Sequence, residues 1–189
     1  MERTAKFICI IGKPNCGKST AAEKLMTAAG TGLIITPDFD NWNAKFGEID
    51  LSEAKNYHYT GIKSAVYQSD EDFGYIYNWF FDGLLVLDDC RNYVPANFDH
   101  SQIANIIRRK RQRMMDIAIM AHQLSEVPKK FFGYITEYLI FPTEGNADAR
   151  KDVLFDKTEK LNAIIARVNH RAIAEHNEHV SQYVKVEKL

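Results

Sequence analysis

The chain has 189 residues, of which 46% are hydrophobic and 26% are charged. This length suits one α/β core rather than two, and the composition excludes disorder as the default state. The formal net charge of −1 excludes a global positive field for nucleic acid or an anionic membrane, so any such contact must be local. No apolar run reaches the ~20 residues of a membrane span, and nothing resembles a signal peptide. The cysteines Cys9, Cys16 and Cys90 lack metal-ligand spacing, which favours reduced thiols in a cytoplasmic protein.

The first third of the chain alternates short apolar runs with a helical stretch. Phe7–Ile11 is a compact apolar run bounded by glycine, which predicts a buried parallel strand. Lys18–Ala29 has helical composition, and residues 32–36 form a second apolar run that Pro37 interrupts. Residues 43–68 mix strand-forming and charged residues, so their pattern leaves strand, loop and short helix open.

The middle of the chain predicts a helix, a strand and a second helix. Ser69 or Asp70 is a typical N-cap for a helix that extends to residue 81. The run LLVLDD at residues 84–89 predicts a third strand that ends in two carboxylates. Three isoleucines between residues 103 and 107 then share one face of a further helix.

The last part of the chain predicts two more buried strands and a long helix. Asp116–Ala121 reads DIAIMA, and residues 134–141 supply another apolar run. In the region 147–189 the apolar positions approximate helical spacing up to about residue 176, and a short edge strand suits the end. Because strands alternate with helices, we expect one domain over residues 1–189, a three-layer α/β/α sandwich with a mainly parallel sheet of five buried strands.

Residues 12–19 read GKPNCGKS and match the phosphate-loop pattern GxxxxGK[ST]. In such a loop, backbone N–H groups at a helix N-terminus surround a polyphosphate, and glycine permits the close approach. Lys18 is expected to reach the β and γ phosphates of ATP, and the Ser19 hydroxyl to ligate Mg²⁺. Thr20 is expected to face the α phosphate or to stabilise the helix start. The predicted ATP-binding residues are Gly12, Lys13, Pro14, Asn15, Cys16, Gly17, Lys18, Ser19 and Thr20.

A chance glycine-rich turn is the alternative to a phosphate loop. The motif lies between an apolar strand and a helix, which is the context that such a loop requires, and this disfavours the alternative. Cys16 has two interpretations of its own. It is either a small residue that fills a loop position, which we favour, or a redox-sensitive thiol beside the phosphates.

The run LLVLDD leaves Asp88 and Asp89 at the carboxyl edge of the predicted sheet, beside the phosphate loop. Two adjacent buried carboxylates repel each other unless a cation is present. Asp88 is therefore the candidate outer-shell Mg²⁺ ligand, and Asp89 is the candidate catalytic base that orients and polarises the attacking water. The alternative is a pair of acidic loop residues that cap the next element, since Pro95 leaves room for a turn.

Gln123 follows the fourth predicted strand and is a candidate catalytic residue. Its side-chain amide is placed to touch the γ phosphate or to hold the attacking water. A Gln after a strand also commonly bonds to a loop backbone, so this role depends on the other two motifs. His122, one residue earlier, is interpreted as structural rather than catalytic.

Three segments together resemble the FtsK/HerA-type branch of P-loop ATPases: GKPNCGKS, LLVLDD and RQRMMDIAIMAHQL. Within that branch the chain resembles the genome-packaging ATPases of tailless viruses and the ATPase domain of Zot-like phage assembly proteins. The resemblance covers roughly residues 6–143 and includes a strand that ends in Gln, followed by a helix opened by Pro128.

This resemblance implies an ASCE-type strand order, in which the Gln123 strand lies between the Gly12 strand and the Asp88 strand. It also implies Mg²⁺-dependent ATP hydrolysis that moves double-stranded DNA, a homo-oligomeric ring of five or six subunits, and a virion or portal partner. A viral protein would lie in the host cytoplasm or with the virion. The chain departs from the family pattern at Asp89, where these enzymes commonly carry Glu.

The predicted helix before the fourth strand carries a cluster of arginines, which are further candidates. Rings of this type resemble one another in using an arginine from the neighbouring subunit to stabilise transition-state charge. Arg111 and Arg113 are our candidates for that catalytic role, within a cluster that includes Arg108 and Arg109. The alternatives are contacts to DNA phosphates or a solvated helix face.

Two other function classes remain open on the sequence. A small-molecule or nucleotide kinase would use Asp88 or Asp40 to orient an acceptor hydroxyl, but Asp89 and Gln123 suit the activation of water better. A non-enzymatic nucleotide-binding assembly factor would use its C-terminal helix to bind a partner. A GTPase is disfavoured because the chain has no NKxD motif, and Asp38 receives no role.

Overall fold

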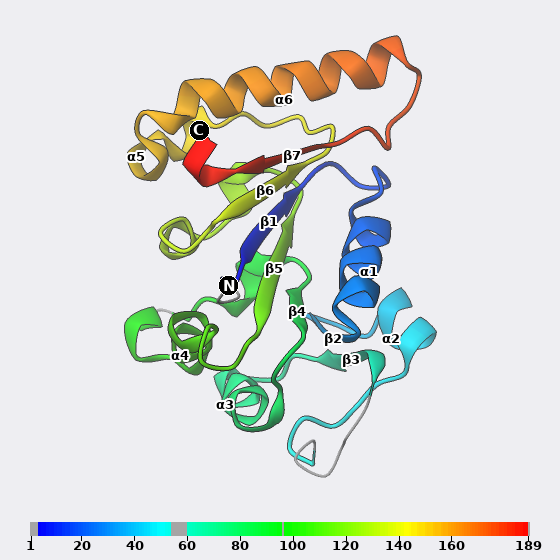
Figure 1. The fold of residues 1–189 in the computed structure, drawn as a ribbon, viewed down its shortest axis with the longest axis vertical. Coiled ribbons are helices and arrows are strands. Elements are labelled where there is room, and N and C mark those ends of the chain that lie inside the picture. The colour runs from blue at the N-terminus through cyan, green and yellow to red at the C-terminus, as the bar shows by residue number, and fades with distance from the viewer. Residues whose placement is uncertain (1–3, 54–59, 96, 189) are drawn as a thin grey trace.

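The computed structural model describes residues 4–53, 60–95 and 97–188. Within these residues, seven strands form one sheet in the order β3-β2-β4-β5-β1-β6-β7 (Figure 1). Neighbouring strands are parallel throughout, except that β7 runs antiparallel to β6. The strands are β1 (Phe7–Ile11), β2 (Thr31–Thr36), β3 (Gly61–Val66), β4 (Leu84–Leu87), β5 (Asp116–Ala121), β6 (Glu137–Ile140) and β7 (Gln182–Lys185).

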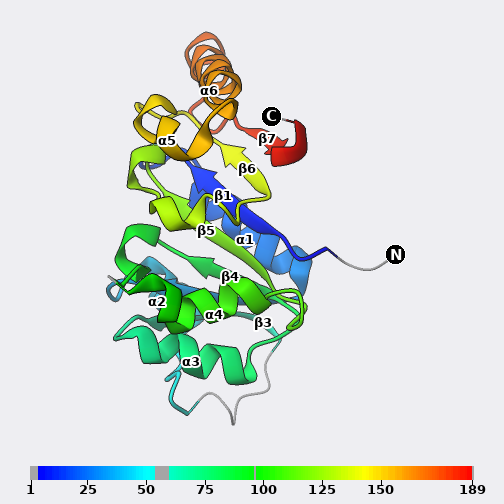
Figure 2. The ribbon, with the colours of Figure 1, turned by 90° about the vertical axis from the view of Figure 1, so that its left-hand side faces the viewer.

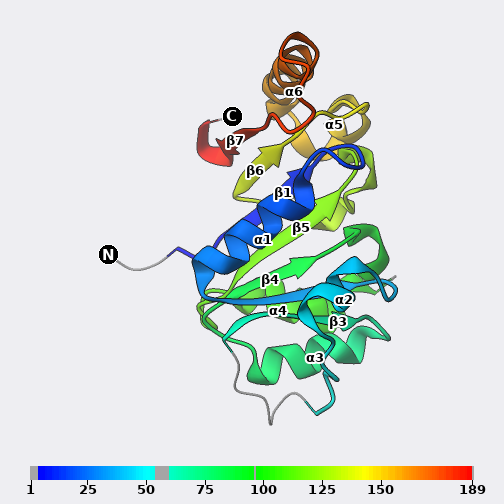
Figure 3. The ribbon, with the colours of Figure 1, turned by 90° about the vertical axis from the view of Figure 1, so that its right-hand side faces the viewer.

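Helices cover both faces of this sheet, which confirms the predicted three-layer α/β/α sandwich. The helices are α1 (Lys18–Ala29), α2 (Asn41–Phe46), α3 (Asp70–Trp79), α4 (Gln102–Arg109), α5 (Lys151–Leu154) and α6 (Lys157–Ala174). Figure 2 shows α3, α4 and α6 on one face, and Figure 3 shows α1 and α2 on the other. Short 3₁₀ turns occur at Cys90–Tyr93, Phe98–His100, Leu124–Glu126, Lys129–Phe131, Asp148–Arg150 and Val186–Lys188.

The central strands are apolar on both faces because helices bury both faces. In β1 all five residues are buried. Ile8 and Ile10 pack in the core beneath α1, whereas Phe7, Cys9 and Ile11 pack in the larger core beneath α3, α4 and α6. Successive side chains thus enter opposite cores, as the two-residue period of a strand requires.

The strand order places β5 between β1 and β4, which confirms the order that the resemblance implies. Ile11 pairs with Ala121, and Leu87 pairs with Ile119. The loops that follow these three strands therefore meet at one edge of the sheet. We call it the carboxyl edge, and the opposite edge the amino edge.

The sheet has seven strands, whereas the sequence predicted five buried strands and one short edge strand. Residues 43–68, whose pattern left their structure open, contribute most of α2 and all of β3, while residues 54–59 lie outside the described residues. At the other end of the sheet, β7 pairs with β6 as the expected edge strand. An edge strand such as β3 packs against fewer neighbours than a central one, so its sequence shows a weaker apolar signal.

Two predicted helices differ from the structure. The continuous helix expected from residue 147 is interrupted between α5 and α6, where Phe155 has a φ of 51°, a left-handed conformation that an α-helix excludes. Pro128 opens only the 3₁₀ turn Lys129–Phe131 rather than a helix. By contrast, α3 begins as expected, with Ser69 as its N-cap in a reciprocal capping box with Asp72.

Cys9, Cys16 and Cys90 are all buried free thiols, in agreement with the sequence interpretation. Among the residues that the structure describes, none of the helices combines the length and apolarity needed to cross a bilayer.

Candidate nucleotide-binding site

The phosphate loop connects β1 to α1 at the carboxyl edge. The Gly12 amide donates to Ala121 O at 3.2 Å, and the Lys13 amide donates to Pro142 O at 2.8 Å, so β5 and the β6 loop hold the loop in place. A Cβ atom on Gly12 would lie 2.5 Å from Cys16 Sγ, which explains the glycine. Gly17 is the N-cap of α1 with a φ of 99°. The amide groups at the N-terminus of α1 therefore form the kind of surface that binds phosphate.

Lys18 is folded back over this loop and is only 9% exposed. Its Nζ donates to Gly12 O at 2.5 Å and to Lys13 O at 2.9 Å, and lies 3.5 Å from His122 Nδ1. Burial lowers the pKa of Lys18, whereas the nearby Cys16, Asp88 and Glu126 act in the opposite direction. A buried ammonium held by carbonyl oxygens is ready to exchange them for phosphate oxygens.

The other loop residues divide into exposed and buried ones. Pro14, Asn15, Ser19 and Thr20 are exposed, so the two hydroxyls are accessible to a ligand. Cys16 is buried, and this burial raises the pKa of its thiol more than nearby Lys18 lowers it. A raised pKa makes a reactive thiolate unfavourable, which supports a packing role for Cys16.

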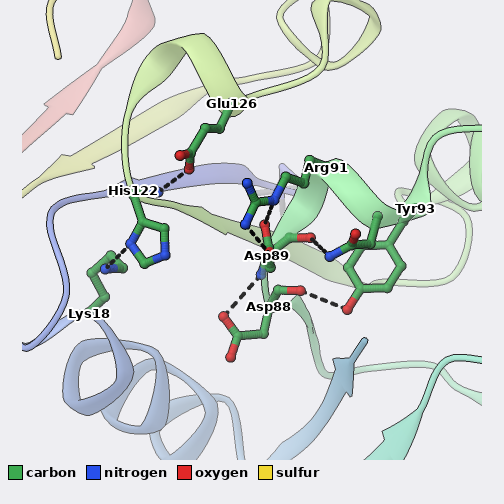
Figure 4. A network of polar contacts seen from close by, with 8 residues as sticks. Lys18, Asp88, Asp89, Arg91, Tyr93, His122 and Glu126 are labelled. Carbon is green, nitrogen blue, oxygen red and sulfur yellow. Dashed lines mark hydrogen bonds and ion pairs between the residues drawn. The ribbon is translucent and has the colours of Figure 1, made fainter. Parts of the chain in front are cut away.

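The two adjacent aspartates point in different directions (Figure 4). Asp88 Oδ2 accepts from the indole Nε1 of Trp42 at 2.9 Å, and Asp88 Oδ1 accepts from the Asp89 amide at 3.0 Å. Burial raises the pKa of Asp88, and the hydrogen bond from Trp42 opposes that effect. Asp89 has a φ of 51°, and its two carboxylate oxygens contact Arg91 at 2.8 and 2.9 Å. Arg91 thus neutralises Asp89 alone, and the Mg²⁺ expected beside Asp88 stays a prediction.

The two residues that follow β5 make different contacts. Met120 packs beneath α1 and Ala121 in the opposite core, so the next side chain, His122, faces the phosphate loop. His122 Nδ1 lies beside Lys18 Nζ, and its amide donates to Glu126 Oε2 at 2.9 Å. The Gln123 side chain instead packs against Gly145, where an added Cβ would lie 2.7 Å from Gln123 Oε1.

His122 and Gln123 both line a pocket of about 250 Å³ next to the phosphate loop. The remaining lining residues are Lys13, Pro14, Glu126, Thr143 and Glu144. Gln123 therefore stays a candidate, but His122, the first residue after β5, is the one whose side chain lies beside the loop lysine. The alternation of side chains along the strand is the sequence signal that identifies it.

The segment between α6 and β7 also reaches the phosphate loop (Figure 1). Glu178 Oε2 forms an ion pair with Lys13 Nζ at 2.7 Å, and this hydrogen bond raises the pKa of Lys13. A Cβ on Gly17 would lie 2.9 Å from His179 Nδ1. Sequence reasoning missed both contacts, because nothing in a local pattern relates the end of the chain to its beginning.

Arg111 and Arg113 lie at the amino edge, away from the phosphate loop of their own chain. They precede β5, and the Arg113 carbonyl accepts from the Asp82 amide just before β4. The Arg113 guanidinium lies over the Tyr77 ring at 5.4 Å and the Phe81 ring at 5.8 Å. Neither arginine therefore belongs to the group of side chains around the phosphate loop.

The donor set suits Mg²⁺ bound together with a polyphosphate. Among the described residues, no group of three or more His, Cys, Asp or Glu side chains could hold a metal by itself. Mg²⁺ commonly takes one or two protein oxygens and completes its shell with phosphate and water. The exposed Ser19 hydroxyl and the Asp88 carboxylate are oxygen ligands of this kind, so they fit the ion.

No sequence profile of a known protein family matches the chain, and no curated protein matches its sequence significantly. The fold, however, is similar to that of solved structures of the genome packaging NTPase B204 from Sulfolobus turreted icosahedral virus 2. The complex with AMP has a TM-score of 0.69 at 10% identity, and covers 97% of this chain and 94% of that one.

Two further structures of B204 agree. The sulfate complex has a TM-score of 0.70 at 11% identity, with 97% of this chain and 93% of that one covered. B204 from Sulfolobus turreted icosahedral virus, described as a DNA-packaging ATPase, has a TM-score of 0.63 at 11% identity and the same coverage. At such low identity the likeness concerns architecture. The resemblance to viral packaging ATPases is thus confirmed at the level of the fold, and this chain has the α/β fold of P-loop NTPases.

Proposed function

We propose that the protein is a Mg²⁺-dependent ATPase that moves double-stranded DNA, as a viral genome-packaging motor does. The observation that carries the proposal is the convergence of Lys18, Asp88 and His122 on the phosphate loop at the carboxyl edge. The fold supports it, since B204 is described as a genome packaging NTPase and has been solved with AMPPCP.

Binding of the triphosphate would use the loop amides and Lys18. Lys18 Nζ would leave the carbonyl oxygens of Gly12 and Lys13 and donate to the β and γ phosphates. That movement would leave His122 Nδ1 facing the phosphates, where it can contact a γ phosphate when one is present. Ser19 and Asp88 would hold Mg²⁺, which neutralises phosphate charge when bound.

Hydrolysis would use Asp89 as the base that orients and deprotonates water, with Gln123 holding that water. Both oxygens of Asp89 are engaged by Arg91, so this role requires Asp89 to exchange the guanidinium for water. A closed ion pair of this kind suits an enzyme that is slow until a partner or DNA rearranges the site.

The motor activity would require a ring of copies. Arg111 or Arg113 of a neighbouring copy would stabilise charge on the transferred phosphoryl group, because neither reaches the loop of its own chain. Double-stranded DNA and a virion or portal component would be the macromolecular partners.

The test is the ATPase rate with and without double-stranded DNA, measured across protein concentrations and compared with oligomer size. The proposal expects phosphate release without any acceptor, stimulation by DNA, and higher specific activity in the oligomer. Lys18→Ala is the inactive control. Phosphoryl transfer that needs an acceptor would instead indicate a kinase, and nucleotide binding with negligible turnover under all conditions would indicate an assembly factor.

A further inference from the structure

Trp42 contacts Asp88, and the proposed function gives this tryptophan no role. Its indole Nε1 donates to Asp88 Oδ2 at 2.9 Å, and the side chain is only 7% exposed. The indole stacks on the ring of Phe46, with centroids 5.8 Å apart and an interplanar angle of 26°. Trp42 belongs to α2, the short helix that follows β2.

The start of α2 is held rigidly by local hydrogen bonds. The Trp42 amide donates to Asp40 Oδ1 at 2.8 Å, and the Asp40 amide donates to Asn43 Oδ1 at 2.9 Å. This reciprocal capping box fixes the backbone of Trp42.

Buried side chains then tie α2 to the sheet. Asn43 Nδ2 donates to Ser64 Oγ at 3.1 Å, and Thr36 Oγ1 donates to Asn43 Oδ1 at 3.2 Å. All three side chains are almost fully buried. Buried hydrogen bonds are costly to break, so β2 and β3 fix the position of α2 and therefore that of the indole.

These contacts fix the orientation of the Asp88 carboxylate. One oxygen accepts from the indole and the other from the Asp89 amide, while each oxygen keeps a lone pair for a further partner. A ligand that is already oriented loses less entropy when it engages a metal and its waters, and removal of such supporting contacts typically lowers metal affinity.

We propose that Trp42 is the positioning residue for the metal-binding carboxylate, because its indole N–H holds Asp88 in the orientation that receives Mg²⁺-nucleotide. This inference rests on the proposed function, in which Asp88 serves Mg²⁺. It assigns α2 a role that neither the phosphate loop nor the LLVLDD run indicates.

The experiment compares Trp42→Phe with Trp79→Phe. Phenylalanine keeps an aromatic ring against Phe46 and removes the N–H donor. Trp79 is the chain's other tryptophan and lies at the end of α3, so its replacement is a matched control. Affinity for a fluorescent ATP analogue, mant-ATP, is measured by anisotropy in MgCl₂ and in EDTA, together with the thermal midpoint of unfolding.

The expected result is a loss of about tenfold or more in Mg²⁺-dependent affinity for Trp42→Phe, the size typical of a hydrogen bond to a charged group. Its affinity in EDTA should match that of the control, and Trp79→Phe should bind like the wild type in both buffers. The thermal midpoint verifies that each variant is folded at the assay temperature. Equal weakening in MgCl₂ and EDTA, or no weakening, would overturn the inference.

Failure of this inference is distinguishable from failure of the proposed function. If wild-type protein hydrolyses ATP and Trp42→Phe keeps its Mg²⁺-dependent affinity, only the role of Trp42 is wrong. If wild-type protein binds mant-ATP but does not hydrolyse ATP, the ATPase proposal fails, and the difference between MgCl₂ and EDTA still decides the role of Trp42.

Discussion

The carboxyl edge and the amino edge of the sheet both collect charged residues, but they use them differently. At the carboxyl edge Lys18, Asp88 and His122 lie around a loop whose amide N–H groups can donate to an anion. At the amino edge the arginines pack on partners of their own chain: Arg113 on Tyr77 and Phe81, and Arg108 on Asp99. Charged side chains that face the same space are typical of a binding site. Charged side chains that each pair with a partner in their own chain stabilise the fold, unless another molecule displaces those partners.

Lys18→Ala should produce the largest effect at the carboxyl edge. It removes the loop side chain that places a cation between the β and γ phosphates, so turnover should be abolished and ATP binding weakened. Phosphate release and mant-ATP binding measure the two effects. Lys24→Ala, an exposed lysine on the same helix, is the control and should behave like the wild type. Wild-type turnover in Lys18→Ala would remove the basis for the whole site.

Arg111→Ala and Arg113→Ala test the amino edge. If one of these arginines acts on the ATP of a neighbouring copy, its loss should lower turnover ~10³-fold or more with little change in ATP affinity. Mixing that variant with Lys18→Ala protein should restore some activity, because the mixed interface contains one intact loop and one intact arginine. Arg171→Ala, on α6, serves as the control.

If activity is independent of protein concentration and no mixture shows complementation, the amino edge of one copy does not contact the carboxyl edge of another. DNA binding then separates the remaining roles of the arginines. A lost phosphate contact makes the slope of log affinity against log salt shallower by about one unit, while loss of a structural arginine leaves the slope unchanged.

Asp89→Asn should lower turnover by at least about 10², since a positioned base typically contributes that much, and should leave Mg²⁺-dependent mant-ATP binding intact. Arg91→Ala is the second variant. It removes the guanidinium from both oxygens of Asp89, so turnover should be unchanged or higher. If Asp89→Asn instead loses nucleotide binding, Asp89 is the metal residue, and the assignment of the two aspartates must be exchanged.

Asp88→Asn should have the smallest effect, on the stability of the nucleotide-free protein. Burial raises the pKa of folded Asp88 above its unfolded value, so the protein loses stability as the pH rises from the unfolded pKa through the folded pKa. Asparagine removes this cost but keeps only one of the two hydrogen bonds, because its single oxygen can accept from Trp42 or from the Asp89 amide, not from both. The variant should therefore gain on the order of 1 kcal/mol at pH 7, the usual size for one substitution.

That gain should disappear as the pH falls below the ordinary aspartate pKa of about 4, where wild-type Asp88 is protonated in both states. Urea unfolding at both pH values measures it. Asp89→Asn is the comparison and should show no such gain, because Arg91 pairs with its carboxylate. An equal effect of Asp88→Asn at both pH values would rule out burial of charge as the cause.

Local patterns were sufficient for the central strands and the phosphate loop. The strand at Phe7–Ile11, the helix at Lys18–Ala29 and the pair Asp88 and Asp89 lie where their residues predicted, because apolar runs and glycine positions constrain the backbone nearby. The same reasoning missed β3 and α2, since the apolar signal of an edge element is weak and its helix is held by side chains of other strands.

The sequence by itself determined the class of fold and the edge of the sheet at which Lys18, Asp88 and Asp89 lie, because these follow from backbone geometry and from the period of each strand. Only the tertiary structure decided which side chains touch. It placed Trp42 on Asp88, Arg91 on Asp89, His122 rather than Gln123 on Lys18, and Glu178 on Lys13. Each of these contacts depends on how two elements pack and on the face of the helix or strand from which the side chain projects. A one-residue change of register would point the side chain to the other face.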